Sequence, residues 1–274
     1  MSVHDTVGIL AEACFRPESV GTCANDQLAT LLVTKMCKPK KYFIDVGAHI
    51  GSIISGVIQH DSSIRIIAIE AAPDKATRLR KKFPTVEIYQ YALGDSEGEV
   101  PFFINNKRSG YSSLLQPTIQ NESNTTQIKV LMTRLDSLVS ASEIDVVKVD
   151  VEGAEFEVFR GSECLLKKNR PTVMFESGPY ANNELGFAKG DLWQWLTERG
   201  YAVLIPNRVA HDDPGLSKDG FIEAHLYPMR TTNYFAIPNE RRIEIRDCAR
   251  EILKISSTEK KKWGEKGSGL PRAS

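Results

Sequence analysis

An acidic residue followed closely by two glycines is the first feature of this sequence that could bind a ligand. Residues 41–51 read KYFIDVGAHIG, so an apolar run ends near Asp45 and the chain then turns at Gly47 and Gly51. Glycine permits a sharp turn and lets a ligand approach the backbone closely. The free amides at the start of the following helix attract electron-rich groups. This turn is therefore a candidate ligand site.

The spacing of the glycines separates two kinds of ligand. A dinucleotide fingerprint needs the pattern G-x-G-x-x-G, but His49 stands where the middle glycine would be. An acid before the turn would repel a pyrophosphate, whereas Asp45 could accept hydrogen bonds from a cationic amine such as that of S-adenosylmethionine. The turn thus favours a methyl donor over NAD.

A second carboxylate ends the next apolar run. Residues 64–70 read IRIIAIE, and Glu70 follows Asp45 by 25 residues, which fits one strand–helix–strand unit. A carboxylate at this place can accept two hydrogen bonds from a ribose diol. Glu70 is therefore the candidate ribose ligand. The alternative interpretation is a surface acid at a strand end.

Three further acids follow two later apolar runs. Asp150 and Glu152 come directly after residues 144–149, and Glu176 ends residues 172–176. Ligands of open α/β sheets bind beyond the carboxyl ends of the strands, so we expect these acids at one rim. They are candidate catalytic residues, because a carboxylate there could remove the proton of an acceptor hydroxyl. Helix capping is the alternative for Asp150.

A metal and a histidine are alternatives for the same chemistry. Asp150 and Glu176 could hold Mg²⁺, which would acidify a bound hydroxyl, but amine binding would need the same two carboxylates, so no metal ligand is assigned. His225 is a further candidate base. His211 and His225 lack the H-x-x-x-H spacing of a zinc site.

Lys148 interrupts the apolar run that precedes Asp150. A lysine inside a buried strand is costly unless it is paired with an acid. We expect its ammonium group to contact Asp150 or Glu176.

A mostly parallel sheet would bring these residues together. Short runs rich in β-branched and aromatic residues are typical of strands buried on both faces, and such runs occur at 42–46, 64–70, 86–93, 99–104, 128–132, 144–149, 172–176, 201–205 and 231–237. The last two are expected to form an antiparallel pair at the sheet edge. Between them, residues 206–230 form a polar insertion.

Helices are predicted before, between and after these strands. Apolar residues at helical spacing around Pro17 and Gly21 predict two N-terminal helices that cover the sheet or act as a lid. The basic helix after Pro73, which contains Lys75, is expected to face solvent. Asp136 is expected to cap a short helix near 137–140. We expect an N-terminal cap at 1–40, one domain at 41–240, and a helix with a flexible tail at 241–274.

Composition excludes several classes of protein. The chain has 274 residues with 41% hydrophobic content and no net charge, so no overall field attracts nucleic acid. Five cysteines without C-x-x-C spacing argue against a zinc site or a disulfide framework. The sequence shows neither a secretory signal nor a membrane span. A cytoplasmic protein with a small-molecule or glycan substrate is expected.

Taken in order, the acidic motifs resemble the FkbM family of S-adenosylmethionine-dependent methyltransferases. They are DVGAHIG at 45–51, IEAAP at 69–73, ALGD at 92–95, TRLD at 133–136, VKVDVEGAE at 147–155 and FE at 175–176. The resemblance covers about residues 41–176 and returns weakly at 233–238, and His49 replaces the asparagine usual in the family. It implies a class I, Rossmann-like α/β fold, with a doubly wound, mostly parallel seven-stranded sheet and an antiparallel last strand.

The resemblance also implies which residues bind the methyl donor and which part of the chain encloses the acceptor. S-adenosylmethionine is the methyl donor, and the residues expected to bind it are Asp45, Gly47, Ala48, His49, Gly51, Glu70, Ala71, Ala92, Leu93 and Asp150. Ala92 and Leu93 would line the adenine, with Asp95 near its amine, and Ser112 and Ser113 would touch donor or acceptor. The acceptor would be a hydroxyl on a sugar, glycolipid or natural product, enclosed by the 206–230 insertion.

Two other functions stay open at this point. One is a nicotinamide-dependent oxidoreductase, which the missing middle glycine disfavours. The other is a catalytically silent protein that binds S-adenosylmethionine and serves as a scaffold.

Overall fold

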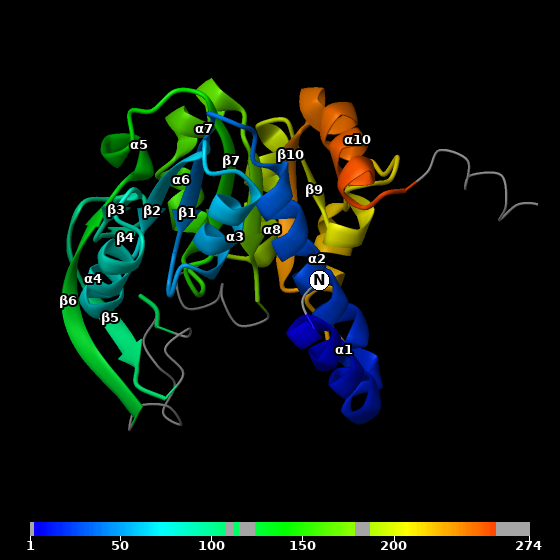
Figure 1. Cartoon of the computed structure of the whole chain (residues 1–274), viewed down its shortest axis with the longest axis horizontal. Coiled ribbons are helices and arrows are strands. Elements are labelled where there is room, and N and C mark those ends of the chain that lie inside the picture. Colours follow the sequence, from blue (N-terminus) through cyan, green and yellow to red (C-terminus); the bar gives the residue numbers. More distant parts are fainter. Residues whose placement is uncertain (1–2, 108–111, 115–123, 179–186, 256–274) are drawn as a thin grey trace, which may run out of the picture.

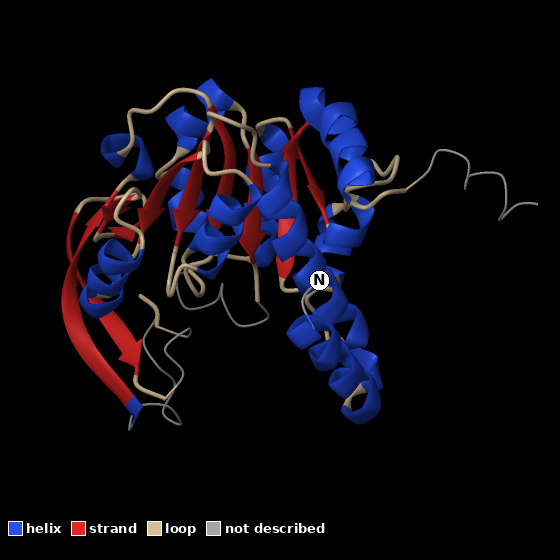
Figure 2. Cartoon of the chain, viewed as in Figure 1, coloured by secondary structure: helices blue, strands red, loops and turns tan. Residues whose placement is uncertain are grey.

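A seven-stranded sheet forms the centre of the computed structural model, which describes residues 3–107, 112–114, 124–178 and 187–255 (Figures 1 and 2). Its strand order is β3-β2-β1-β7-β8-β10-β9. The strands are β1 Tyr42–Val46, β2 Arg65–Ile69, β3 Glu87–Tyr89, β7 Ile144–Val149, β8 Thr172–Glu176, β9 Tyr201–Leu204 and β10 Asn233–Pro238. All neighbours pair in parallel except β10, which is antiparallel to β8 and β9. The predicted sheet is confirmed.

The central strands are apolar because both of their faces are covered. Every residue of β7 is buried, as are the last four residues of β1. Three charged residues break this pattern, Asp45 on β1 and Asp145 and Lys148 on β7. Asp45 and Lys148 are direct partners in the parallel register of the two strands. The sheet thus places opposite charges side by side in its interior.

Helices cover both faces of the sheet, as the doubly wound topology requires (Figure 2). One face carries α2 Val20–Met36, α3 Ser52–His60, α4 Pro73–Lys82 and α10 Arg242–Ile252. The other carries α5 Leu135–Leu138, α6 Glu155–Arg160, α7 Glu163–Asn169, α8 Lys189–Glu198 and α9 Lys218–Glu223. Each face has its own hydrophobic cluster, so the sheet separates two cores.

A second sheet of three strands stands beside the main one, in the order β4-β6-β5. It consists of β4 Ala92–Leu93, β5 Gly98–Asn105 and β6 Thr125–Thr133, and its two long strands extend well below the main sheet in Figure 1. The strand expected at 86–93 is therefore wrong as a single element. Residues 87–89 pair with β2, whereas Ala92 and Leu93 pair with β6, so the chain changes sheets between them.

The N-terminal helices do not share one role. α1 Val3–Phe15 and α2 are separated by the 3₁₀ turn η1 Pro17–Ser19, and Gly21 lies inside α2. Leu32 and Val33 of α2 are buried against the sheet, whereas Leu10 and Phe15 of α1 are 60% and 83% exposed. α1 projects away from the sheet in Figure 1. The expectation that both helices cover the core was wrong for α1.

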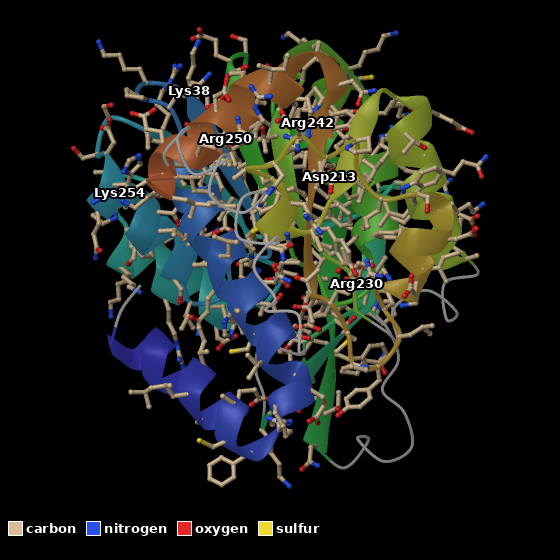
Figure 3. All side chains as sticks on the ribbon, turned by 90° about the vertical axis from the view of Figure 1, so that its right-hand side faces the viewer. Lys38, Asp213, Arg230, Arg242, Arg250 and Lys254 are labelled. Carbon is tan, nitrogen blue, oxygen red and sulfur yellow. The ribbon has the colours of Figure 1, made fainter. Side chains whose placement is uncertain are left out.

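The connection between β9 and β10 is fastened to the C-terminal helix. It contains the 3₁₀ turn η4 Pro206–Arg208 and α9, and η5 Asn239–Arg241 precedes α10. Arg242 Nη1 donates to the carbonyl of Val209 at 3.1 Å and Arg250 Nε to that of Ala210 at 2.8 Å. Figure 3 shows Arg242 and Arg250 on α10, with Asp213 on the connection beside it. The end of the tail, residues 256–274, lies outside the described residues.

None of the helices among the described residues has the length and apolar character that a membrane crossing requires.

Candidate active site

A cavity of about 200 Å³ opens at the carboxyl ends of β1, β2, β7 and β8, beside the second sheet. Nine residues expected from the sequence line it: Gly47, His49, Glu70, Ala71, Ala92, Leu93, Asp150, Glu152 and Glu176. Ser112, also expected near a substrate, lines it too. The predicted position beyond the strand ends therefore coincides with the cavity.

The turn at Gly47 is packed directly against the chain that follows β7. Its φ is +76°, and a Cβ atom at this position would lie 1.7 Å from the carbonyl oxygen of Asp150. The Gly47 and Ala48 amides donate to the carbonyl of Ile69 at 2.9 and 3.1 Å. Both the conformation and the contact require glycine here.

Glu70 is held in place by two backbone amides. Its Oε2 accepts from His49 N at 2.8 Å and its Oε1 from Ala72 N at 2.9 Å. Glu70 is 5% exposed, and burial raises its pKa against the opposing effect of these hydrogen bonds and of Lys75. His49 adopts a φ of 51°, in the left-handed region. Each carboxylate oxygen still has a lone pair for a ligand hydroxyl.

Asp45, expected to contact the donor amine, lies behind the cavity wall. Its side chain is 1% exposed and is absent from the cavity lining. Lys148 Nζ lies 3.1 Å from Asp45 Oδ1, 3.2 Å from Asp150 Oδ2 and 2.8 Å from the Gly47 carbonyl. The expected direct contact is corrected, because Lys148 stands between Asp45 and the site. Of the two partners proposed for Lys148, Asp150 is confirmed.

Two other turn residues shape the site without lining the cavity. Ala48 is 4% exposed and belongs to the hydrophobic core. A Cβ atom on Gly51, whose φ is +74°, would lie 2.3 Å from the Phe83 ring. Both residues pack the turn, and their contact with the donor stays a prediction.

Three carboxyl groups meet at the rim. Asp150, Glu152 and Glu176 each present an oxygen, and these atoms lie within 4.8 Å of one another. Burial raises the pKa of Glu152 to about 8, with Asp150 and Glu155 adding repulsion. Burial opposes ionisation of Asp150 as well, but Lys148 and a hydrogen bond from Glu176 lower its pKa. Burial and the nearby Asp150 charge raise the pKa of Glu176. The cluster is therefore partly protonated at neutral pH.

The loop that carries Glu152 is supported from two sides. Glu155 Oε1 accepts from Gly153 N at 3.0 Å, and the Ser113 hydroxyl donates to the Glu152 carbonyl at 2.6 Å. Ser113 also exchanges backbone hydrogen bonds with Phe103 of β5 at 2.9 and 3.1 Å. The residues just before Ser112, 108–111, lie outside the described residues.

The sequence model of the FkbM methyltransferase domain matches residues 45–203, which is more than half of the chain. This chain belongs to the FkbM methyltransferase family.

Three proteins similar to this FkbM protein are distant from it in sequence. It is 27% identical over 173 residues to the 2-O-methyltransferase NoeI of Sinorhizobium fredii, covering 56% of this chain and 69% of NoeI. The FkbM methyltransferase structure from Methylobacillus flagellatus KT matches with a TM-score of 0.45 and 15% identity, over 72% of this chain and 43% of that one. A TehB-like S-adenosylmethionine-dependent methyltransferase from Corynebacterium glutamicum has a TM-score of 0.40 and 11% identity, over 76% and 85% of the two chains. The match to the Methylobacillus protein thus spans less than half of its length.

Sequence reasoning missed several residues that line the cavity of the FkbM protein, among them Lys75, Tyr91, Phe102 and Leu114. Lys75 was expected on a solvated helix face, but it is 8% exposed, and burial lowers its pKa. Lys75 lies at the start of the helix that follows Glu70, and this position in the sequence could have indicated that it lies near the cavity. Phe102 and Leu114 come from the second sheet and its adjoining segment, and the sequence pattern of apolar runs did not predict that this sheet lies at the site.

Two residues expected near a substrate are engaged elsewhere. His225 is 4% exposed; its Nδ1 lies 2.7 Å from the Phe221 carbonyl and its Nε2 2.8 Å from the Ser177 hydroxyl. Burial lowers its pKa to about 4. Asp95 pairs with Arg160 at 2.8 Å. Neither residue lines the cavity, so neither expectation is retained.

Proposed function

We propose that this FkbM protein transfers the methyl group of S-adenosylmethionine to a hydroxyl on a sugar, glycolipid or natural product. The observation that carries the proposal is one cavity lined by both Glu70, at the end of β2, and Asp150, at the end of β7. The name of the relative NoeI, a 2-O-methyltransferase, supports oxygen as the acceptor atom.

The residues of the cavity fit the methyl donor. Glu70 offers a fixed carboxylate to the ribose hydroxyls, and Ala92 and Leu93 offer an apolar wall to the adenine. Gly47 lines the cavity too, and its turn is packed against the Asp150 carbonyl. Asp150, kept charged by Lys148, is suited to the donor amine. The acidic cluster also complements the positive charge of the sulfonium group.

Methyl transfer depends mainly on the alignment of the donor methyl group with the acceptor oxygen. Methyl transfer is an in-line displacement, and holding the two reactants in place can contribute about 7–11 kcal/mol. The acceptor must also lose a proton. Glu152 is the best base because burial raises its pKa to about 8, close to neutral pH, where a general base is most effective. The positive charge of the bound donor would favour its ionised form. Glu176 is hydrogen-bonded to Asp150 and fixes the direction of that carboxylate.

A magnesium ion at the three carboxyl groups is an alternative route to an acidified hydroxyl. Their oxygens are close enough for one ion. We do not adopt it, because Lys148 already neutralises Asp150 at 3.2 Å. Calorimetric titration of Mg²⁺ with and without S-adenosylhomocysteine tests this choice, and tight binding would reverse it.

Calorimetry tests the donor. S-adenosylhomocysteine should bind, and NAD should not, because His49 occupies the position of the middle glycine of a dinucleotide fingerprint. The variant Glu70→Ala should weaken S-adenosylhomocysteine at least about tenfold, since two charge-assisted hydrogen bonds are lost. Glu87→Gln, on the exposed end of β3, is the matched control. Unchanged binding by Glu70→Ala would refute the ribose assignment.

Turnover tests the reaction. A labelled methyl group should pass from the donor to a member of a panel of sugars, glycolipids and natural-product alcohols. Donor binding without transfer to any alcohol would favour the silent scaffold. Transfer to a nitrogen acceptor in place of oxygen would refute O-methylation.

A further inference from the structure

Lys148 links the buried Asp45 to two residues that line the cavity, Gly47 and Asp150. Its ammonium lies 3.1 Å from Asp45 Oδ1, 3.2 Å from Asp150 Oδ2 and 2.8 Å from the carbonyl oxygen of Gly47. An ammonium group has three N–H bonds. The Gly47 contact is a hydrogen bond and the two carboxylate contacts are ion pairs, so three acceptors surround the three N–H bonds.

The geometry explains why a charged residue is tolerated on a central strand. Lys148 and Asp45 are partners in the register of β7 and β1, and both side chains are almost completely buried, at 6% and 1% exposure. A buried charge without a partner is strongly unfavourable. Asp45 therefore compensates Lys148, which leaves the same ammonium free to direct Asp150 and the Gly47 peptide.

Lys148 contacts both chain segments that are proposed to bind the donor. Gly47 belongs to the turn after β1, and Asp150 begins the loop after β7, where its carbonyl oxygen already blocks any side chain at Gly47. The Asp150 amide also donates to the Val46 carbonyl at 3.1 Å. Lys148 adds the side-chain link between the same two segments.

We propose that Lys148 is a positioning residue for the methyl donor: it holds the Asp150 carboxylate and the Gly47 peptide in binding geometry, with Asp45 as its buried counter-ion. Asp45 then acts on the donor only through Lys148. This inference rests on the proposed function, since it assumes that Asp150 and the Gly47 turn contact the donor.

Four proteins test the proposal: wild type, Asp45→Asn, Lys148→Met and the double variant Asp45→Asn/Lys148→Met. The melting temperature and the dissociation constant for S-adenosylhomocysteine are measured for each. Lys148→Met should melt at a much lower temperature, because it leaves the Asp45 carboxylate buried without a partner. The double variant should recover most of that loss, because neither charge remains.

Binding then separates positioning from stability. The double variant should bind S-adenosylhomocysteine about tenfold more weakly, or worse, despite its recovered melting temperature. Asp45→Asn, which keeps Lys148, should lose less than about threefold. Wild-type or tighter binding by the double variant would overturn the proposal. Equal losses in Asp45→Asn and the double variant would overturn it as well, because Asp45 would then act without Lys148.

The proposed function fails in a different way. If the wild-type protein does not bind S-adenosylhomocysteine, the donor assignment is wrong whatever the variants do. The melting temperatures still report whether Lys148 and Asp45 compensate each other.

Discussion

The hydroxyl of Ser113 donates a 2.6 Å hydrogen bond to the backbone carbonyl of Glu152. This bond joins the segment beside β5 to the loop that follows β7, and it fixes a residue whose φ of 54° lies in the left-handed region. Such a conformation persists only where its surroundings enforce it. The second sheet thus helps to orient the proposed base.

Replacing Ser113 with alanine should therefore slow methyl transfer more than it weakens donor binding. The lost hydrogen bond is worth about 0.5–1.5 kcal/mol, so kcat should fall about two- to tenfold while the dissociation constant for S-adenosylhomocysteine stays within about twofold. Ser140→Ala, at an exposed position, is the control. An unchanged kcat would show that Ser113 does not orient Glu152.

Gly47→Ala should abolish donor binding. A Cβ atom would lie 1.7 Å from the Asp150 carbonyl at a φ of +76°, so either the turn or the β7 loop must move. We expect S-adenosylhomocysteine affinity to fall beyond detection and the melting temperature to drop by several degrees.

The matched control for that change is Gly21→Ala. Gly21 lies in α2, and a Cβ atom there meets nothing within 4 Å. Alanine is favoured over glycine in a helix by about 1 kcal/mol, so this variant should melt at a slightly higher temperature and bind the donor normally. A Gly47→Ala protein with wild-type affinity would contradict the packing of the turn.

Asp136→Ala should destabilise the protein without touching the site. Asp136 was expected to cap a short helix at 137–140, but its Oδ2 accepts from Cys164 N at 3.0 Å and its Oδ1 from Leu165 N at 2.8 Å. It therefore caps α7 across the fold. Loss of a cap costs about 0.5–2 kcal/mol, which corresponds to a melting temperature lower by about 1–8 °C.

Thermal unfolding measures this effect, and Glu97→Ala, on an exposed turn, is the control. The dissociation constant for S-adenosylhomocysteine should not change, because Asp136 does not line the cavity. A loss of affinity would mean that donor binding depends on the stability of α7.

The main sheet could be predicted from the sequence because most of its strands are short apolar runs, and β2, β7 and β8 end at or directly before an acidic residue. Glu70, Asp150 and Glu176 could be placed at one rim from that pattern alone, since carboxyl ends of parallel strands lie on the same side. The expected contact of Asp45 failed for a different reason. Whether Asp45 faces a ligand or Lys148 depends on the register between β1 and β7, which no local pattern contains.

Other misses share this dependence on distant contacts. Lys75 looks like any residue of a charged helix, and only the three-dimensional arrangement buries it at the cavity. Leu93 continues the pattern of a strand but pairs with β6, some 40 residues later in the chain. Propensity describes a residue and its neighbours in sequence, whereas these outcomes are decided by segments that meet only in the fold.

The raised pKa of Glu152 predicts opposite pH effects on activity and on stability. As a base, Glu152 must be ionised, so kcat/KM should rise about tenfold per pH unit and level off above about 8. Because its pKa in the folded protein exceeds the reference value of 4.5, the folded state binds the proton more tightly than the unfolded state does. Its contribution to stability is therefore complete below about pH 4.5 and is lost as the pH rises through about 8.

Glu152→Gln tests both effects in one variant. The rise of kcat/KM with pH should disappear, and kcat should fall about 10²- to 10⁴-fold, the usual contribution of a general base. Relative to wild type, the variant should melt at a higher temperature near pH 9 and at a similar one near pH 4, because the neutral amide avoids the cost of a buried charge only where Glu152 is ionised. A pH profile that keeps its rise in this variant would assign the base to another carboxylate, of which Asp150 and Glu176 are the nearest.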